Sequence, residues 1–260
     1  NDATFSNFVK NNLNTSTSKF LSIPGSSFLV MQLFKSKIKN INSIDQFQDQ
    51  VKIVLKNIVK QTINSFETSG LESLDKSKPY LFIGNHRDIT LDSALCNFSL
   101  DSVGLETTFN AIGDNLVSIG WMGDLLRLNK SFVISRTGDS KKEIYTNLLK
   151  ASKFIKEKLH SGNHVWIAQK QGRSKDGLDK TDPAVLKMLH IALRKECTFE
   201  ELTNYYNIIP CSVSYEIDPL AKEKAKQLQG EASKNENDDI SHIFKGVMEF
   251  KGNVSLRFAQ

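Results

Sequence analysis

Apolar residues follow two different spacings along the chain, and the change between them divides the sequence into two parts. In the first part they recur at three- and four-residue steps, most clearly from Phe47 to Thr62, as on one face of a helix. Ser43 and Gln46 stand just before this run in the arrangement of a capping box. The pattern predicts a helical N-terminal segment over residues 1–68.

An earlier apolar stretch lies in the same segment, from Phe28 to Ile41, and Lys35, Lys37 and Lys39 interrupt its second half. Two interpretations stay open. The stretch is either a helix that packs on the main domain or a contact with a membrane surface, since basic amphipathic helices bind anionic lipid.

After Gly70 short apolar runs alternate with amphipathic segments, which is typical of a buried sheet with helices between its strands. We therefore expect an α/β domain over residues 69–260, with a mostly parallel or mixed central sheet flanked by helices. The candidate strands are Tyr80–Ile83, Phe132–Ile134, Val165–Ala168, Ile208–Val213 and Val254–Phe258. Candidate helices run over residues 144–159 and from Asp182-Pro183, a cap followed by proline. The polar segment Lys222–Asp239 is expected as a surface helix or loop insertion.

The composition is that of an ordinary folded protein. The chain has 260 residues, of which 39% are hydrophobic and 24% charged, and this excludes collagen-like and wholly disordered classes. Its net charge of +5 is a mild basic excess that favours anionic partners. The excess falls short of that of a dedicated nucleic-acid-binding protein, so no nucleic-acid partner is expected.

Cys96, Cys197 and Cys211 lie far apart and form no CxxC pair, so neither a disulfide framework nor a cysteine-based zinc site is indicated. No apolar run approaches the roughly 18 to 20 residues that span a bilayer. These features lead us to expect an intracellular, cytoplasmic protein.

The strongest candidate for chemistry is His86, which follows the apolar run Tyr80–Ile83 through Gly84-Asn85. This places it at the carboxyl end of a predicted strand, where α/β folds bind ligands. Asp88 and Asp92 come shortly after, and a carboxylate can fix the tautomer of an imidazole and stabilise its protonated form. Residues six apart on one helix point roughly 240° apart, so His86 must precede the helix if Asp92 is to reach it. The alternative is that both acids are helix caps.

A second cluster, Gln171 to Lys175, follows another predicted strand. Gly172 allows the backbone to approach a ligand, while Arg173 and Lys175 suit a phosphate group. Arg136 ends a third strand candidate. Each of these residues alone is compatible with an ordinary surface turn, but three such strand ends predict a common site at one edge of the sheet.

Several common enzyme classes are disfavoured, because the sequence contains no GxSxG, Walker A, HExxH or GxGxxG motif. His160 and His164 are separated by a turn-forming Ser-Gly-Asn sequence, so they do not share a helix face and no metal site is expected.

Taken in order, these elements resemble the glycerol-phosphate and lysophosphatidate acyltransferase family, which is recognised by an Asn-His-x4-Asp block. The four similar segments are Asn85-His86 with Asp92, Asn129–Arg136, Gln171–Ser174 and Ile208–Pro210. Two departures stand out. Five residues, not four, separate His86 from Asp92, which leaves Asp88 as an alternative partner, and Gln171 replaces the usual Glu.

The resemblance implies transfer of a fatty acyl group from a thioester to a hydroxyl of glycerol 3-phosphate or lysophosphatidate in phospholipid synthesis. His86 would be the general base, with Asp92 or Asp88 to orient it. The residues implied in binding the phosphorylated acceptor are Arg136, Gln171, Gly172, Arg173 and Lys175. The backbone near Gly172, or the start of the helix after His86, would steady the oxyanion.

The implied donor is acyl-CoA or an acyl carrier protein, used as co-substrate, with no further cofactor. A peripheral contact with the cytoplasmic face of the membrane is also expected. Two other functions stay open. One is transfer to a different acceptor, such as an amino-acid-derived or lipid A-type lipid, and the other is a phospholipid-binding module that has lost catalysis.

Overall fold

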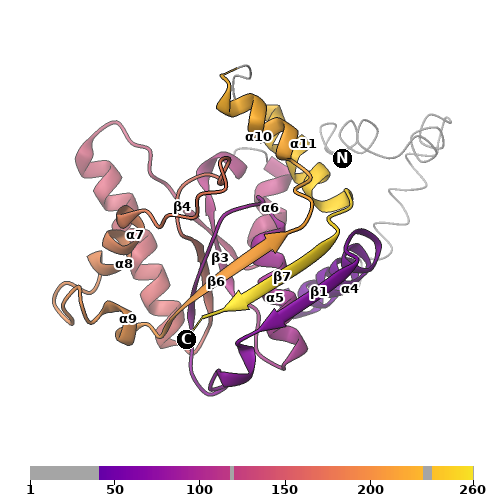
Figure 1. Cartoon of the computed structure of the whole chain (residues 1–260). Coiled ribbons are helices and arrows are strands. Elements are labelled where there is room, and N and C mark those ends of the chain that lie inside the picture. Colours follow the sequence, from indigo (N-terminus) through magenta and orange to yellow (C-terminus); the bar gives the residue numbers. More distant parts are fainter. Residues whose placement is uncertain (1–40, 118–119, 231–235, 260) are drawn as a thin grey trace.

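The computed structural model describes the backbone of residues 41–117, 120–230 and 236–259. Its strands form one seven-stranded sheet in the order β1-β7-β6-β2-β5-β3-β4, which confirms the α/β prediction (Figure 1). The strands are β1 (Ser65–Ser69), β2 (Leu81–Gly84), β3 (Phe109–Gly113), β4 (Ser131–Ile134), β5 (Val165–Ala168), β6 (Ile208–Tyr215) and β7 (Asn253–Phe258). The α-helices are α4 (Ile44–Thr62), α5 (Leu91–Ser102), α6 (Gly120–Leu128), α7 (Lys141–His160), α8 (Pro183–Ile191), α9 (Leu202–Tyr205), α10 (Ala221–Leu228) and α11 (Glu236–Met248).

The sheet is mixed. β6, β2, β5, β3 and β4 run parallel to one another, so their carboxyl ends meet at one edge. β7 is antiparallel to β6, and β1 is parallel to β7. The pair β1 and β7 therefore lies beside β6 at one edge of the parallel part, and both strands run antiparallel to it.

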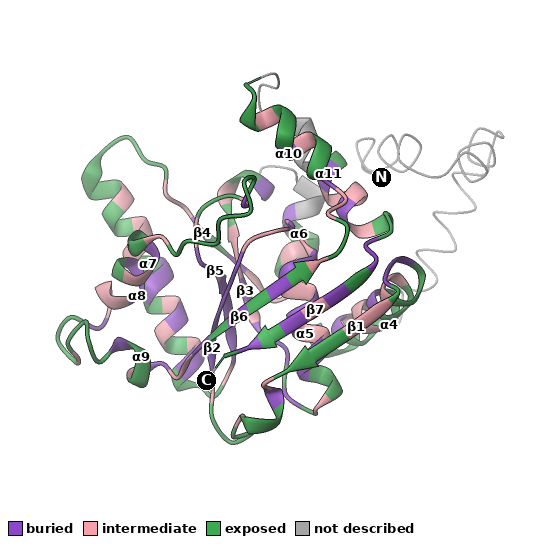
Figure 2. Cartoon of the chain, viewed as in Figure 1, coloured by how far each residue is buried: buried purple, intermediate pink, exposed green. Residues whose placement is uncertain are grey.

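Helices cover the parallel strands on both faces. One hydrophobic core contains Leu55 of α4 and Leu95 of α5, and the other contains Ile155 of α7 and Leu189 of α8. Successive residues of β2 point alternately into the two cores, and the whole strand is buried (Figure 2). Burial on both faces explains why this strand reads as a continuous apolar run.

Two predicted helix starts are confirmed. The Ser43 hydroxyl accepts a hydrogen bond from the Gln46 backbone at the start of α4, and the Asp182 carboxylate accepts one from Ala184 at the start of α8. Of the polar segment Lys222–Asp239, residues 222–228 lie in α10 and residues 236–239 begin α11. The stretch from residue 28 to 41, with its suggested membrane contact, lies outside the described residues but for its last position.

Two strands were not predicted. β1 crosses the boundary drawn at residue 68, and its sequence Ser-Phe-Glu-Thr-Ser is largely polar. β1 is an edge strand, held by pairing with β7 rather than by burial on two faces. β3 contains the buried polar residue Asn110, which breaks the apolar run that marks the other central strands.

Among the helices that the structure describes, none combines the length and apolar character of a transmembrane segment.

Candidate active site

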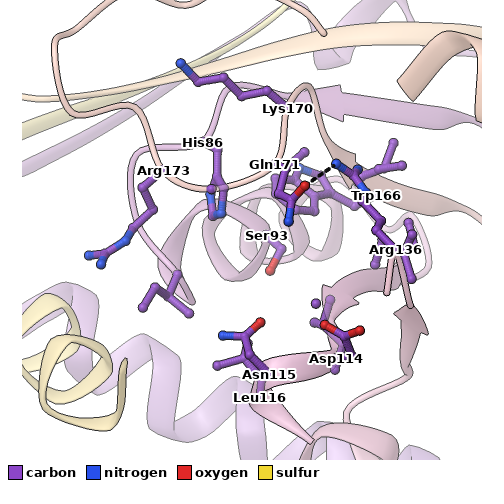
Figure 3. Close-up of a pocket in the computed structure, with 18 of the residues that line it drawn as sticks. His86, Ser93, Asp114, Asn115, Leu116, Arg136, Trp166, Lys170, Gln171 and Arg173 are labelled. Carbon is purple, nitrogen blue, oxygen red and sulfur yellow. Dashed lines mark hydrogen bonds between the residues drawn. The ribbon is translucent and has the colours of Figure 1, made fainter. Parts of the chain in front are cut away.

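A cleft of about 530 Å³ lies at the edge where β2, β5, β3 and β4 have their carboxyl ends. In Figure 3 the His86 ring points into this cleft, between the loop that carries Gln171 and the segment that carries Asn115. Its lining includes the predicted residues His86, Arg136, Gln171, Gly172, Arg173 and Lys175. The connections after four neighbouring strands thus bring these side chains to one place.

His86 and Asp92 face each other across the start of α5. Nδ1 of the imidazole lies 3.3 Å from Oδ2 of the carboxylate. The same oxygen accepts hydrogen bonds from the backbone N–H groups of Arg87, at 2.7 Å, and Asp88, at 2.9 Å. His86 precedes the helix and Asp92 occupies its first turn, so the carboxylate reaches back to the ring despite the extra residue between them.

Asp88 has a different place. Its Oδ1 accepts hydrogen bonds from the backbone N–H groups of Thr90 and Leu91, both at 2.8 Å, so it caps α5. Burial, and then the charge of Asp92, raises the pKa of Asp88 above its ordinary value. Asp88 is not among the cleft-lining residues. The carboxylate in contact with His86 is therefore that of Asp92.

The second ring nitrogen of His86 is the reactive candidate. Because Nδ1 faces a carboxylate, the neutral ring keeps its proton on Nδ1, and Nε2 then carries the lone pair. The side chain is 18% exposed. In the described part of the chain, no side chain or backbone group is hydrogen-bonded to Nε2. A substrate hydroxyl in the cleft can therefore give its proton to this nitrogen.

The cleft also holds basic side chains that follow β4 and β5. Arg136 donates from Nη1 to the Gln171 side-chain oxygen at 3.3 Å, and the Lys175 side chain is exposed. Arg173 instead lies 3.1 Å from His242 Nδ1 through Nη2, while its buried Nη1 has no hydrogen-bond partner among the described residues. Arg136 and Lys175 are thus the predicted cations most accessible to a ligand.

The loop after β5 is hydrogen-bonded to the loop after β2, which carries His86. The Ser174 backbone N–H donates to the His86 carbonyl at 2.6 Å. Gly172 has a φ of +74°, a left-handed conformation that glycine adopts without strain. The basic loop and His86 are therefore held in a defined relation.

A close backbone approach supports the base of the cleft. A Cβ atom on Gly84 would lie 2.7 Å from the indole of Trp166, and Trp166 lines the cleft. Any other residue at this position would clash with the indole, which packs against the backbone of β2. This identifies a role for the glycine that precedes Asn85-His86.

Several residues around the site were missed in the sequence. Tyr215 donates from its hydroxyl to Oδ1 of Asp92 at 3.0 Å, and Lys224 of α10 donates to the Arg87 carbonyl at 2.7 Å. Asp114, which follows β3, accepts hydrogen bonds from Ser135 and Thr137. No local pattern marks these residues, because their partners lie 21 to 137 positions away in the chain.

Within the described ranges, no three His, Cys, Asp or Glu side chains come together in a way that would hold a metal ion. What the cleft offers is an imidazole backed by a carboxylate, together with several cationic side chains. Such a set suits proton removal from a hydroxyl on an anionic molecule.

Comparison with known proteins finds a family model and a solved structure that are similar to this chain. The family model described as Acyltransferase matches residues 65–214, more than half of the chain. Among solved structures, the chain is similar to the 1-acyl-sn-glycerophosphate (LPA) acyltransferase PlsC from Thermotoga maritima. The match has 14% sequence identity and a TM-score of 0.41, and it covers 90% of this chain and 76% of that one. The comparison with curated proteins finds no match.

Proposed function

Because this chain belongs to the acyltransferase family, we propose that it moves a fatty acyl group from a thioester to a hydroxyl of glycerol 3-phosphate or lysophosphatidate. The observation that carries the proposal is the contact of His86 Nδ1 with Asp92. It leaves Nε2 free for a substrate in a cleft that cationic side chains also line. His86 is the general base and Asp92 its orienting partner.

The reaction needs no covalent enzyme intermediate. His86 Nε2 takes the proton of the acceptor hydroxyl as the oxygen attacks the thioester carbonyl and the new C–O bond forms. When the C–S bond breaks, the imidazolium returns the proton to the leaving thiolate, so the products are an ester and a free thiol. Asp92 stabilises the imidazolium between these steps, and such acid–base assistance typically contributes 10²- to 10⁴-fold.

The oxyanion that develops on the carbonyl needs hydrogen-bond donors. Backbone N–H groups at the start of α5 already donate to Asp88 and Asp92. The loop around Gly172 is the better supported source of donors, because it lines the cleft and turns through a left-handed residue.

The cationic side chains in the cleft favour a phosphorylated acceptor. Arg136 and Lys175 line the cleft and suit a phosphate group, the arginine through its forked donors. Holding the acceptor there makes attack on the thioester effectively unimolecular. The apolar part of the cleft lining, suited to an acyl chain, includes Ile89, Ala111, Ile112, Leu116, Ile134 and Ile167.

The acyl donor in this proposal is acyl-CoA or an acyl carrier protein. The net charge of +5 favours either one, since both are anionic. In this proposal the enzyme works in the cytoplasm, in peripheral contact with the inner face of the membrane. A direct test of this part is sedimentation of the full chain with vesicles that contain anionic lipid.

The test of the chemistry is a panel of acceptors. Palmitoyl-CoA is incubated with glycerol 3-phosphate, lysophosphatidate or unphosphorylated monoacylglycerol, and release of free thiol is followed. We expect release that depends on a phosphorylated acceptor, lost by 10²- to 10⁴-fold in His86→Ala and retained in the control His160→Ala. His160 is exposed at the end of α7, at the opposite edge of the sheet.

Other outcomes reject particular parts of the proposal. Thiol release that survives the loss of His86 excludes it as the base, and release without any acceptor indicates a thioesterase. Activity on unphosphorylated lipids alone favours a different lipid acceptor. The extra residue between His86 and Asp92 does not prevent their contact.

A further inference from the structure

Tyr215 lies at the end of β6 and reaches the site from the side away from the cleft. Its hydroxyl donates to Asp92 Oδ1 at 3.0 Å, while Oδ2 of the same carboxylate faces His86. Burial of the hydroxyl, and then the charge of Asp92, raises the pKa of Tyr215 well above its ordinary value. The phenol therefore stays protonated and remains a hydrogen-bond donor throughout the neutral pH range.

The two oxygens of Asp92 are held by different parts of the chain. Oδ2 is bound by the backbone N–H groups of Arg87 and Asp88, which belong to the same loop as His86. Among the described residues, the Oδ1 donor is Tyr215 alone. It is 123 positions away in the chain and belongs to a strand adjacent to β2 in the sheet.

We propose that Tyr215 is a positioning residue, which fixes the rotation of the Asp92 carboxylate and limits the negative charge that it presents to the His86 ring. The proposal rests on the proposed function in one respect, that His86 is the base. A carboxylate that accepts a hydrogen bond on one oxygen presents less charge at the other, so Tyr215 tunes how strongly Asp92 stabilises the imidazolium.

Other charged groups face this pair from the surrounding elements. Asp88 lies at the start of α5, Asp218 follows β6, and Lys224 of α10 contacts the backbone beside His86. The loop after β5 contributes Arg173 and Lys175, and Arg136 follows β4. Removing only the Tyr215 hydroxyl leaves all of these charged groups in the chain, so a change at His86 in that variant reports on the hydroxyl itself.

The variant Tyr215→Phe keeps the aromatic ring and removes the donor. Without the hydroxyl, Asp92 presents more negative charge to the ring, which favours the imidazolium. We expect the acid limb of the pH profile of kcat/KM to move to higher pH by about half a pH unit. At acid pH, where less of the base is then neutral, kcat/KM should be lower than in the unchanged chain. A role in packing alone would lower stability without moving the profile.

The chain offers a matched control in Tyr206→Phe. Tyr206 is also buried, but its hydroxyl has no hydrogen-bond partner within the described ranges, and it packs in the core on the other face of the sheet. Its removal deletes a buried phenol oxygen without touching Asp92. The profile of this variant should coincide with that of the unchanged chain.

The decisive measurement does not need activity. The full chain, labelled with isotopes in its five histidines, is titrated by NMR, and the His86 signal is assigned by its loss in His86→Ala. The expected result is a higher titration midpoint for His86 in Tyr215→Phe and an unchanged midpoint in Tyr206→Phe. An unchanged midpoint in a folded Tyr215→Phe overturns the proposal. A shifted midpoint in a protein that transfers no acyl group would reject the proposed function while the coupling of Tyr215 to His86 stands.

A second version of the experiment applies if Tyr215→Phe does not fold. The chain is produced with 3-fluorotyrosine, whose more acidic phenol donates more strongly. The His86 titration midpoint should then move to lower pH. If it stays where it is in the unmodified chain, the proposal is wrong.

Discussion

Two groups of side chains at the cleft are held in different ways. In the first, Asp92 is 3% exposed and accepts hydrogen bonds from two backbone groups and Tyr215, so His86 has a fixed partner. In the second, Gln171 and Lys175 are exposed, although the backbone of their loop is bonded to the His86 carbonyl. The contact between Arg136 and Gln171 is a single bond of 3.3 Å. The difference indicates that the base is fixed before substrate arrives, whereas the side chains expected to bind the acceptor are held by fewer contacts.

The largest effect should come from Asp92→Asn, which removes the charge of the fixed partner of His86. The amide keeps the shape of the side chain but cannot stabilise the imidazolium with a charge. We expect kcat to fall by about 10²- to 10⁴-fold, measured by thiol release with a saturating phosphorylated acceptor.

The matched control for this change is Asp88→Asn, since Asn is as good a helix cap as Asp. It removes a buried carboxylate two residues from His86 but outside the contact with the ring. Its activity should stay close to that of the unchanged chain. If Asp88→Asn loses as much activity as Asp92→Asn, the assignment of the partner is wrong.

Among the cations of the cleft, Arg136→Gln should weaken binding of the acceptor and leave the rate of the chemical step nearly unchanged. We expect KM for the phosphorylated acceptor to rise about 10- to 100-fold, the worth of a charged hydrogen bond. KM for the acyl donor and kcat at saturation should change little. Arg257→Gln on the exposed side of β7 removes the same charge and serves as control. Equal effects from the two variants would point to general electrostatics instead.

A smaller effect separates the backbone of the basic loop from its charges. Gly172 and Gly162 have φ values of +74° and +81°, and a Cβ on either one meets no atom within 4 Å. Alanine at either position should therefore lower the free energy of unfolding by a similar amount, about 1 kcal/mol. Only Gly172→Ala should also reduce kcat/KM, because Gly162 lies in the turn before β5, away from the cleft. Similar activity in both variants would contradict a role for the Gly172 loop.

Local pattern was enough to place His86. The run from Tyr80 to Ile83 predicts a buried strand, and the loop after a buried parallel strand must emerge at the carboxyl end of that strand. The same reasoning placed Arg136 and the loop around Gly172 after strands that proved to be β4 and β5. Because β2, β5, β3 and β4 are neighbours in the sheet, the predicted residues meet in one cleft.

Side-chain partners were beyond the sequence. Nothing in the spacing decides between Asp88 and Asp92. The choice depends on where the helix begins, since α5 starts at Leu91 and leaves Asp88 to cap it. Tyr215 and Lys224 reach the site from positions 123 and 137 residues away from their partners. Such contacts depend on the order of strands, which periodicity does not encode.

The place of β1 in the sheet has a consequence for how the chain matures. Within the described residues its strand partner is β7, and the first pair in their register, Ser65 and Asn253, lies 188 positions apart. While the polypeptide is being made, β1 must therefore wait for β7 before it can join the sheet. Closing such a distant pair is slow, so this edge should be the last part of the newborn protein to become resistant to proteases.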